Sequence, residues 1–299
     1  MSFLNKILKQ NKKLVTHNAT FHTDDIFATA TLSILLDGNI EVIRTRDESI
    51  IANADYVYDV GGIYDPSKNR FDHHQKGGAG VRPNGVPYAA FGLVWKAYGE
   101  KVCGSATVAE RIDEGLVQAI DAQDNGIDTY ETKGAVGPYL IQSMFNAFRP
   151  SWKEEEEYDK PFLEIVEFAK KFLLRKIKRV RDDLEAESYV KKDYENAKDK
   201  RLIILDGSYP WSDILMEYPE PLYVVVLRGN AWRVCCVRKE ENSFENRKSL
   251  PEAWAGLRDL EMAKASGVPD ATFCHNGRFL AVAKSKEGAL ALANKALSM

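Results

Sequence analysis

The stretch YVYDVGGIYDPSKNRFDHHQ, residues 56–75, joins an apolar strand to a double glycine and then to a pair of adjacent histidines. The apolar run predicts a strand, and Gly61 and Gly62 end it. Asp59 stands at the tip of that strand, where a buried carboxylate is costly unless hydrogen bonds or a cation satisfy it. In a parallel α/β sheet, ligands bind outside the carboxyl ends of the strands, so this position favours a ligand site.

The first half of the chain alternates short strand-like runs with helical patterns. Strands are predicted at 13–18, 40–46 and 54–62, and helices at 24–36, 87–99 and 111–126. Pro87 is expected near the first turn of the second helix and Gly99 after its end, whereas Asn125 and Gly126 end the third. This alternation implies a doubly wound, mostly parallel sheet that is covered by helices on both faces.

Residues 152–200 are dense in both charge signs and place apolar side chains at helical spacing, which predicts one long amphipathic helix. Strand candidates restart at 201–207, 221–229 and 231–239, and helical patterns follow them. We therefore predict an α/β protein with a catalytic domain at 1–150, a helical connector at 151–200 and a smaller α/β domain at 201–299.

The composition is that of a soluble globular protein, with 44% hydrophobic and 28% charged residues. A net charge of −3 argues against a strongly basic nucleic-acid binder, although it is compatible with a local basic groove. The four cysteines form no CxxC pair and are expected as free thiols of a cytoplasmic protein. No apolar run approaches a membrane span, and the basic start is expected to be a surface segment, with an organelle presequence as the alternative.

Side chains that bind metals gather in four motifs at the expected ends of successive elements. Each motif alone is typical of a helix terminus or a polar turn. Together they predict a metal site without cysteine ligands, for which we expect Mn²⁺, with Mg²⁺, Co²⁺ or Zn²⁺ as alternatives. The motifs offer more ligands than one ion needs, so we expect two ions that share a bridging carboxylate. The residues are His17, His22, Asp24 and Asp25; Asp59; Asp72, His73 and His74; and Asp121 and Asp124.

These residues also carry a resemblance. FDHHQ is similar to the DHH motif of the DHH phosphoesterase superfamily, and the chain resembles the melanocyte-proliferating-gene (MYG) family over nearly its whole length. The similar stretches are THNATFHTDDIFATATL, YVYDVGGIYDPSKNRFDHHQ, GVPYAAFGLVWKAYG, IDAQDNGI and FCHNGRFLAVAKSKEGAL. The resemblance implies a metal-dependent phosphoesterase, most closely a 3′–5′ exonuclease on single-stranded RNA or short oligonucleotides, in eukaryotes in the nucleus or mitochondrion.

The resemblance also implies roles for particular residues. His17, Asp24 and His73 match metal ligands, Asp59 matches the bridging carboxylate, and either Asp121 or Asp124 matches the last ligand. His22 stands where the superfamily has an aspartate, which puts the preferred metal in doubt. In the mechanism we expect, a hydroxide activated by two metal ions attacks phosphorus, and His74 or Asp25 transfers a proton.

The C-terminal domain is expected to supply the groups that hold the substrate. Residues 274–288 offer cations beside a glycine turn, and the resemblance points to the same segment. Arg228 and Arg233 share a strand region with Trp232, which suits stacking on a base. The glycine-rich loop 74–89 could bring Lys76 or Arg82 to a phosphate, or be an ordinary flexible loop. The substrate-binding candidates are His275, Gly277, Arg278, Lys284 and Arg238.

Two other functions stay open at this point. A small-molecule phosphoesterase or pyrophosphatase would use the same metal centre, but it would need a dense cluster of lysine and arginine. A non-catalytic metal-binding or RNA-binding protein would bind metal without turnover. The sequence does not decide between RNA and DNA or the direction of cleavage, and it leaves a homodimer open as the oligomeric state.

Overall fold

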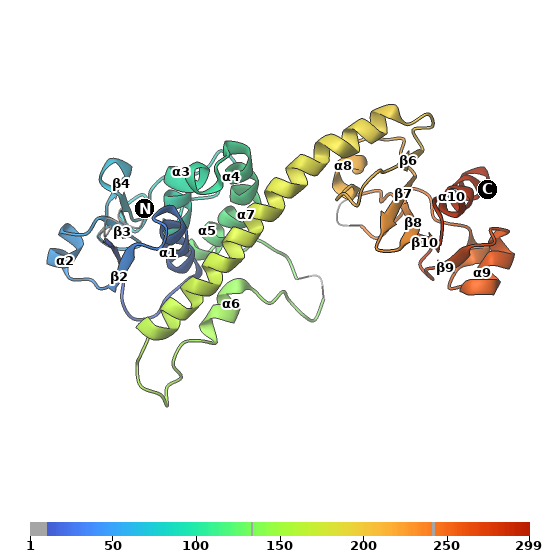
Figure 1. Cartoon of the computed structure of the whole chain (residues 1–299). Coiled ribbons are helices and arrows are strands. Elements are labelled where there is room, and N and C mark those ends of the chain that lie inside the picture. Colours follow the sequence, from blue (N-terminus) through green and yellow to red (C-terminus); the bar gives the residue numbers. More distant parts are fainter. Residues whose placement is uncertain (1–10, 133, 241–242) are drawn as a thin grey trace, which may run out of the picture. The chain divides into compact units, whose positions relative to one another are not determined.

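The computed structural model describes residues 11–132, 134–240 and 243–299. The chain divides into two compact units, of which the first ends at Arg181 and the second begins at Asp182. This boundary falls inside α7 (Asp159–Asn196), the long helix that the charged segment predicts, and Figure 1 shows it unbroken. The domain limits that we expect at 150 and 200 flank this helix and stay predictions. Residues 1–10 of the basic start lie outside the described part of the chain.

The first unit is built on a sheet with the strand order β2-β1-β3-β5-β4. β2, β1, β3 and β5 run parallel, and β4 pairs antiparallel with β5 at the edge. The carboxyl ends of β1, β3 and β5 therefore meet at one edge of the sheet. The strands are β1 (Lys12–Thr16), β2 (Ile40–Arg44), β3 (Tyr56–Tyr58), β4 (Tyr64–Asp65) and β5 (Arg70–Phe71).

Helices cover both faces of this sheet, which confirms the doubly wound architecture. On one face, Leu14 and Tyr58 pack with Leu32 of α1 and Leu93 of α3. On the other, Val15 and Val57 pack against Ile51 of α2. The helices of this unit are α1 (Thr23–Leu35), α2 (Glu48–Ala52), α3 (Ala90–Cys103), α4 (Ala106–Ile112), α5 (Gln118–Asp124) and α6 (Ile141–Asn146), with a 3₁₀ turn at Pro66–Lys68.

Two expected helix limits are wrong. α3 begins at Ala90, after Pro87, and continues through Gly99 to Gly104, whose φ of +67° ends it. Gly99 lies inside the helix, and the ring of Trp95 fills the space beside it, where a Cβ would lie 2.9 Å from the indole. The helix expected at 111–126 is divided into α4, a π-helical turn (Asp113–Val117) and α5, although it does end at Asn125 and Gly126 as predicted.

The second unit has a sheet with the order β6-β7-β8-β10-β9, in which β6 and β7 are parallel and the other neighbours antiparallel. α10 packs on one face, where Leu292 contacts the cluster that contains Val234 and Ala281. The elements are β6 (Leu202–Ile204), α8 (Ser212–Met216), β7 (Tyr223–Arg228), β8 (Ala231–Cys236), a 3₁₀ turn (Glu252–Trp254), α9 (Asp259–Ser266), β9 (Ala271–Cys274), β10 (Leu280–Ala283) and α10 (Lys286–Ser298).

All four cysteines are free thiols, as the sequence predicts. Cys235 and Cys236 belong to the apolar clusters on opposite faces of the second sheet, which follows from the alternation of side chains along a strand. Within the described ranges, no helix combines the length and the apolar character that crossing a membrane requires.

Candidate metal centre

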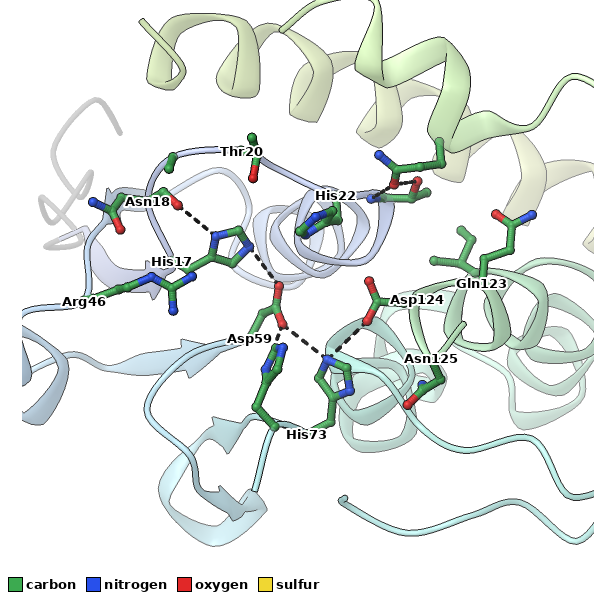
Figure 2. Close-up of a pocket in the computed structure, with 15 residues that line it drawn as sticks. His17, Asn18, Thr20, His22, Arg46, Asp59, His73, Gln123, Asp124 and Asn125 are labelled. Carbon is green, nitrogen blue, oxygen red and sulfur yellow. Dashed lines mark hydrogen bonds and ion pairs between the residues drawn. The ribbon is translucent and has the colours of Figure 1, made fainter. Parts of the chain in front are cut away.

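His17 and His22 of the first motif, Asp59 of the second and His73 of the third meet at the carboxyl edge of the first sheet (Figure 2). His17 follows β1, Asp59 follows β3, and Asp72 and His73 follow β5, so the parallel register brings them together from distant parts of the sequence. His17, Asp59 and His73 line a cavity of about 570 Å³, together with His22 and Asp124. A cavity of this size accommodates a nucleotide-sized ligand.

Asp59 lies at the centre of this group. Its Oδ2 is 3.1 Å from His17 Nε2, and its Oδ1 is 3.3 Å from His73 Nε2, so its two oxygens face different histidines. Burial opposes the ionised form, but the contacts with His17 and His73 outweigh it and lower the pKa of Asp59 below its ordinary value. The φ of +56° at Asp59 is left-handed, a conformation that aspartate tolerates and that is enriched at functional sites.

His73 also contacts a second carboxylate. Its Nε2 lies 3.2 Å from Asp124 Oδ2, and no side chain in the described residues makes a well-aligned hydrogen bond with this nitrogen. Burial disfavours the charged ring, but Asp124 and Asp59 raise the pKa of His73 to about 10. Two carboxylates therefore converge on one imidazole nitrogen, an arrangement in which a divalent cation would replace the proton.

Asp24 supplies the clearest sign of a missing positive charge. Both of its carboxylate oxygens are buried and have no hydrogen-bond partner among the described residues. Burial, followed by the charges of Asp59, Asp124 and Asp25, raises the pKa of Asp24 well above its ordinary value. Ligand atoms of His22, Asp24 and Asp124 lie within 4.8 Å of one another. An unpaired buried carboxylate beside other ligands is a geometry that metal coordination would satisfy.

Two further sets of ligand atoms lie equally close together. One consists of His17, His22 and Asp59, and the other of Asp59, His73 and His74. Asp59 and His22 each belong to two of the three sets. The donor types are imidazole nitrogen and carboxylate oxygen, which suit manganese, zinc, cobalt or magnesium.

Asp121 lies apart from this cluster, whereas Asp124 belongs to it. The Asp121 carboxylate accepts hydrogen bonds from Arg82 Nη1 at 2.7 Å and from the backbone of Gly92 at 2.9 Å. Burial raises its pKa to about 7 although Arg82 opposes the rise. Of the two aspartates that the sequence leaves open, Asp124 is therefore the one that can share an ion with Asp24 and His22.

Arg82 does not take the role expected of it. Its guanidinium is buried and pairs with Asp113 at 2.8 Å as well as with Asp121, so it anchors the glycine-rich loop and offers nothing to a phosphate. The alternative, Lys76, lies in the same loop and is exposed.

The two proton-transfer candidates occupy different places. His74 lines the cavity and is exposed, with its Nδ1 held 2.8 Å from Asp72 Oδ1. This hydrogen bond raises the pKa of His74. Asp25 is fully buried at the start of α1, where it accepts the backbone N–H of His22 at 2.9 Å and lies 3.4 Å from His17 Nε2. Burial raises the pKa of Asp25 to about 7.

Asp72 organises the histidine pair. Its buried carboxylate accepts N–H groups from Gly62 at 2.5 Å and His73 at 2.7 Å in addition to the His74 ring. Asp72 therefore ties the double glycine after β3 to the histidines after β5, which explains why these two features occur in one stretch of sequence.

The cavity also contains polar residues that the sequence analysis does not predict. Arg46 is the one lysine or arginine among the described residues that line it. Arg46 stands just after β2, at the same edge of the sheet, and this position is the signal that could have identified it. Gln142 of α6 accepts hydrogen bonds from the backbone and the hydroxyl of Thr23, and so links α6 to the start of α1.

The predicted substrate residues of the second unit fall in three places. His275, Gly277 and Arg278 form the turn between β9 and β10, in which His275 Nδ1 accepts the N–H of Gly277 at 2.9 Å. Lys284 follows β10 at the opposite end of that strand. Arg238 follows β8, and its guanidinium lies over the exposed ring of Phe244. Their role in binding stays a prediction.

Trp232 and Arg233 do not share a face of β8. Adjacent residues of a strand point to opposite faces, so Trp232 joins the apolar cluster under α10, whereas Arg233 lies on the other face. Lys286 approaches the Trp232 ring.

Fold and site together define a class: an α/β protein with a buried histidine–aspartate cluster at the carboxyl ends of parallel strands. The chain belongs to the MYG1 exonuclease family, described as an uncharacterised protein family (UPF0160), whose family model matches residues 13–297. This membership confirms the resemblance seen in the sequence.

Relatives from distant eukaryotes are similar over nearly the whole chain. A MYG1 protein of Caenorhabditis elegans is 32% identical, over 95% of this chain and 94% of its own. A MYG1 protein of Schizosaccharomyces pombe is 30% identical, over 95% and 97%. The human protein named MYG1 exonuclease is 28% identical, over 96% and 86%.

Proposed function

We propose that the protein is a divalent-metal-dependent phosphodiesterase that shortens single-stranded RNA from its 3′ end. The observation that carries the metal dependence is the buried, unpartnered carboxylate of Asp24 between His22 and Asp124. Relatives that carry the name exonuclease support a nuclease-like activity. The choice of RNA and the direction of cleavage rest on the family resemblance alone.

The cluster fits divalent cations. His17, His22 and Asp59 would hold one ion, and Asp24 and Asp124, whose ligand atoms lie close to His22, would hold a second. His73 lies beside both Asp59 and Asp124 and would complete the ligand set. We favour Mn²⁺ because carboxylates and imidazoles are mixed and no thiolate takes part. When bound, such ions acidify a water molecule and neutralise charge on phosphoryl oxygens.

The chain's own residues would then orient and protonate the substrate. His74 is the exposed imidazole of the cavity, and Asp72 holds its Nδ1, so its Nε2 is the nitrogen that can give a proton to the leaving oxygen. Arg46 would contact a phosphate oxygen of the substrate. Asp25 is buried behind His17 and would act by holding that imidazole in position rather than by touching substrate.

The cavity favours a nucleic acid over pyrophosphate. A pyrophosphate site requires several cations around two phosphates, whereas Arg46 alone represents lysine and arginine among the described lining residues. The side-chain amides of Asn18, Gln123 and Asn125 also line the cavity and offer hydrogen bonds to a sugar or base.

The test is turnover of a 5′-labelled single-stranded RNA with added Mn²⁺, beside the matching DNA and beside pyrophosphate. We expect a ladder that shortens from the 3′ end, is abolished by EDTA, and disappears in His73→Ala and Asp59→Asn. Asp47→Asn, an exposed change at the start of α2, is the matched control and should retain full activity. Full activity in Asp59→Asn, or hydrolysis of pyrophosphate alone, would contradict the proposal.

A further inference from the structure

One face of the second sheet carries a row of alternating arginine and apolar side chains. Arg258 pairs with Phe273 of β9, Phe273 with Val282 of β10, and Val282 with Arg233 of β8. Residues that are paired across neighbouring strands project to the same face, so these four side chains lie side by side. The row continues through Arg233 to Val226 of β7. We call this row, together with His275, the arginine–phenylalanine face.

Within the described residues, the apolar cluster that helices form on this face reaches β7 and Cys235 of β8 but not Arg233, Val282 or Phe273. α10 packs on the opposite face, with Val234 and Ala281. On the same face, Val190 of α7 and Leu215 of α8 cover Val224 and Val226 of β7. Phe273, Val282 and Arg233 keep partial exposure to solvent, and Arg258 is exposed. The described part of the sheet is therefore covered on one side, whereas on the other side Arg233, Val282 and Phe273 stay accessible to solvent.

The cations of this face have no carboxylate partners within the described residues. Arg233 Nε is buried without a hydrogen-bond partner. The guanidinium of Arg258 lies 4.9 Å from the centre of the Phe273 ring. Arg228 of β7 is paired with Ala231 of β8, at a position that projects to the same side as Arg233. Positive charge without internal neutralisation favours a polyanionic partner.

Aromatic rings stand beside these cations. His275 lies two residues beyond Phe273, so it projects to the same face, and the centres of the two rings are 6.3 Å apart. The exposed ring of Phe279 lies 4.2 Å from His275. Flat rings at the surface of an antiparallel sheet, flanked by arginines, are the arrangement by which sheet platforms stack unpaired bases and hold the phosphates between them.

We propose that the arginine–phenylalanine face binds single-stranded nucleic acid, with bases stacked on Phe273 and His275 and phosphates at Arg233 and Arg258. This inference rests on the proposed nuclease function and adds to it. It assigns to the second unit the binding of substrate nucleotides that are not being cleaved. A duplex cannot stack its paired bases on such rings, so the face discriminates against double strands.

The experiment measures binding apart from cleavage. The full-length protein is titrated in EDTA into a fluorescein-labelled single-stranded RNA of twelve nucleotides, a DNA of the same sequence and the matching duplex, and anisotropy gives each Kd. We expect Phe273→Ala and Arg233→Gln each to weaken single-strand binding by about tenfold. Phe273→Trp should restore it, because a ring is present again.

Matched control variants test whether losing any exposed ring or any exposed arginine weakens binding, or only losing those of the arginine–phenylalanine face. Trp152→Ala removes another exposed aromatic ring, and Arg179→Gln removes another exposed arginine charge. Both should bind like the wild type. Circular dichroism shows whether Phe273→Ala is folded. If it is not, Phe273→Leu takes its place, because leucine keeps most of the apolar volume but has no ring. His73→Ala should bind normally but fail to cleave, which separates this proposal from the proposed function.

Unchanged Kd values in Phe273→Leu and Arg233→Gln would overturn the proposal while leaving the nuclease activity intact. Equal affinity for the duplex would overturn it as well. So would a change of oligomeric state in these variants, measured by light scattering, because it would make the face a contact between copies of the chain. Loss of single-strand binding in a monodisperse, folded variant supports the proposal.

Discussion

Asp24 is the residue at which burial and charge conflict most directly. It lies at the start of α1 with both oxygens unpartnered, and its pKa is raised by burial and by three neighbouring aspartates. A lone buried carboxylate destabilises a folded chain, and this cost is the reason for the metal-binding role that we propose for Asp24. The same reasoning does not apply to Asp121, whose charge is neutralised by Arg82.

Asp24→Asn therefore separates stability from function. It keeps the shape of the side chain and removes the charge, so we expect the metal-free protein to gain about 1 kcal/mol of unfolding free energy or more. Mn²⁺ affinity should fall at least tenfold, and RNA turnover should be lost. Urea unfolding in EDTA and calorimetric Mn²⁺ titration measure the two effects. A less stable variant with normal Mn²⁺ affinity would show that Asp24 serves the fold.

At the scale of elements, a glycine in α3 allows α3 and α5 to pack closely together. A Cβ on Gly92 would lie 1.7 Å from Asp121 Oδ2, because the carboxylate sits directly against the backbone of α3. The same carboxylate holds Arg82 and with it the glycine-rich loop after β5. The position of Asp124 one turn further along α5 thus depends on the close approach of the two helices.

Gly92→Ala should destabilise the protein by about 3 kcal/mol, because the helices must separate or Asp121 must leave Arg82. Gly115→Ala is the matched control: nothing lies within 4 Å of its Cβ, and it should stabilise by up to about 1 kcal/mol. Chemical denaturation of both variants tests the pair. Equal stabilities for Gly92→Ala and Gly115→Ala would refute tight packing between α3 and α5.

At the scale of the whole molecule, the cluster makes stability depend on pH. His73 binds its proton more tightly in the folded chain, with a pKa of about 10 against about 6.5 in an unfolded chain. The stabilisation that protonated His73 gives to the folded protein is therefore complete below pH 6.5 and is lost as the pH rises toward 10. Asp59 acts in the opposite sense, because its pKa is lowered in the folded chain. The stabilisation that ionised Asp59 gives is present above about pH 4 and is lost on acidification.

We therefore expect the melting temperature of the protein in EDTA to fall steadily between pH 7 and pH 9.5. His73→Gln cannot hold the charge and should flatten this profile. Mn²⁺ replaces the proton, so its affinity should rise with pH in the same interval. Scanning calorimetry with and without Mn²⁺ measures both trends. A wild-type profile in EDTA that matches that of His73→Gln would contradict the charge assigned to this imidazole.

The sequence by itself determined the alternation of strands and helices, the long helix α7 and the histidines and aspartates that form the site. It did so because periodicity and strand-end position are local properties, which a linear pattern records. The end of α3 was missed because a glycine commonly ends a helix, whereas Gly99 lies inside α3 against the ring of Trp95.

The tertiary structure decided the matters that depend on which distant residues meet. It placed Asp124 beside His73 and turned Asp121 toward Arg82, although both stand on the same short helix. It added Arg46 to the cavity, and it turned Trp232 and Arg233 to opposite faces of the second sheet. Each choice follows from strand register and helix rotation, which are fixed by the burial of apolar surface over the whole fold and not by neighbours in the sequence.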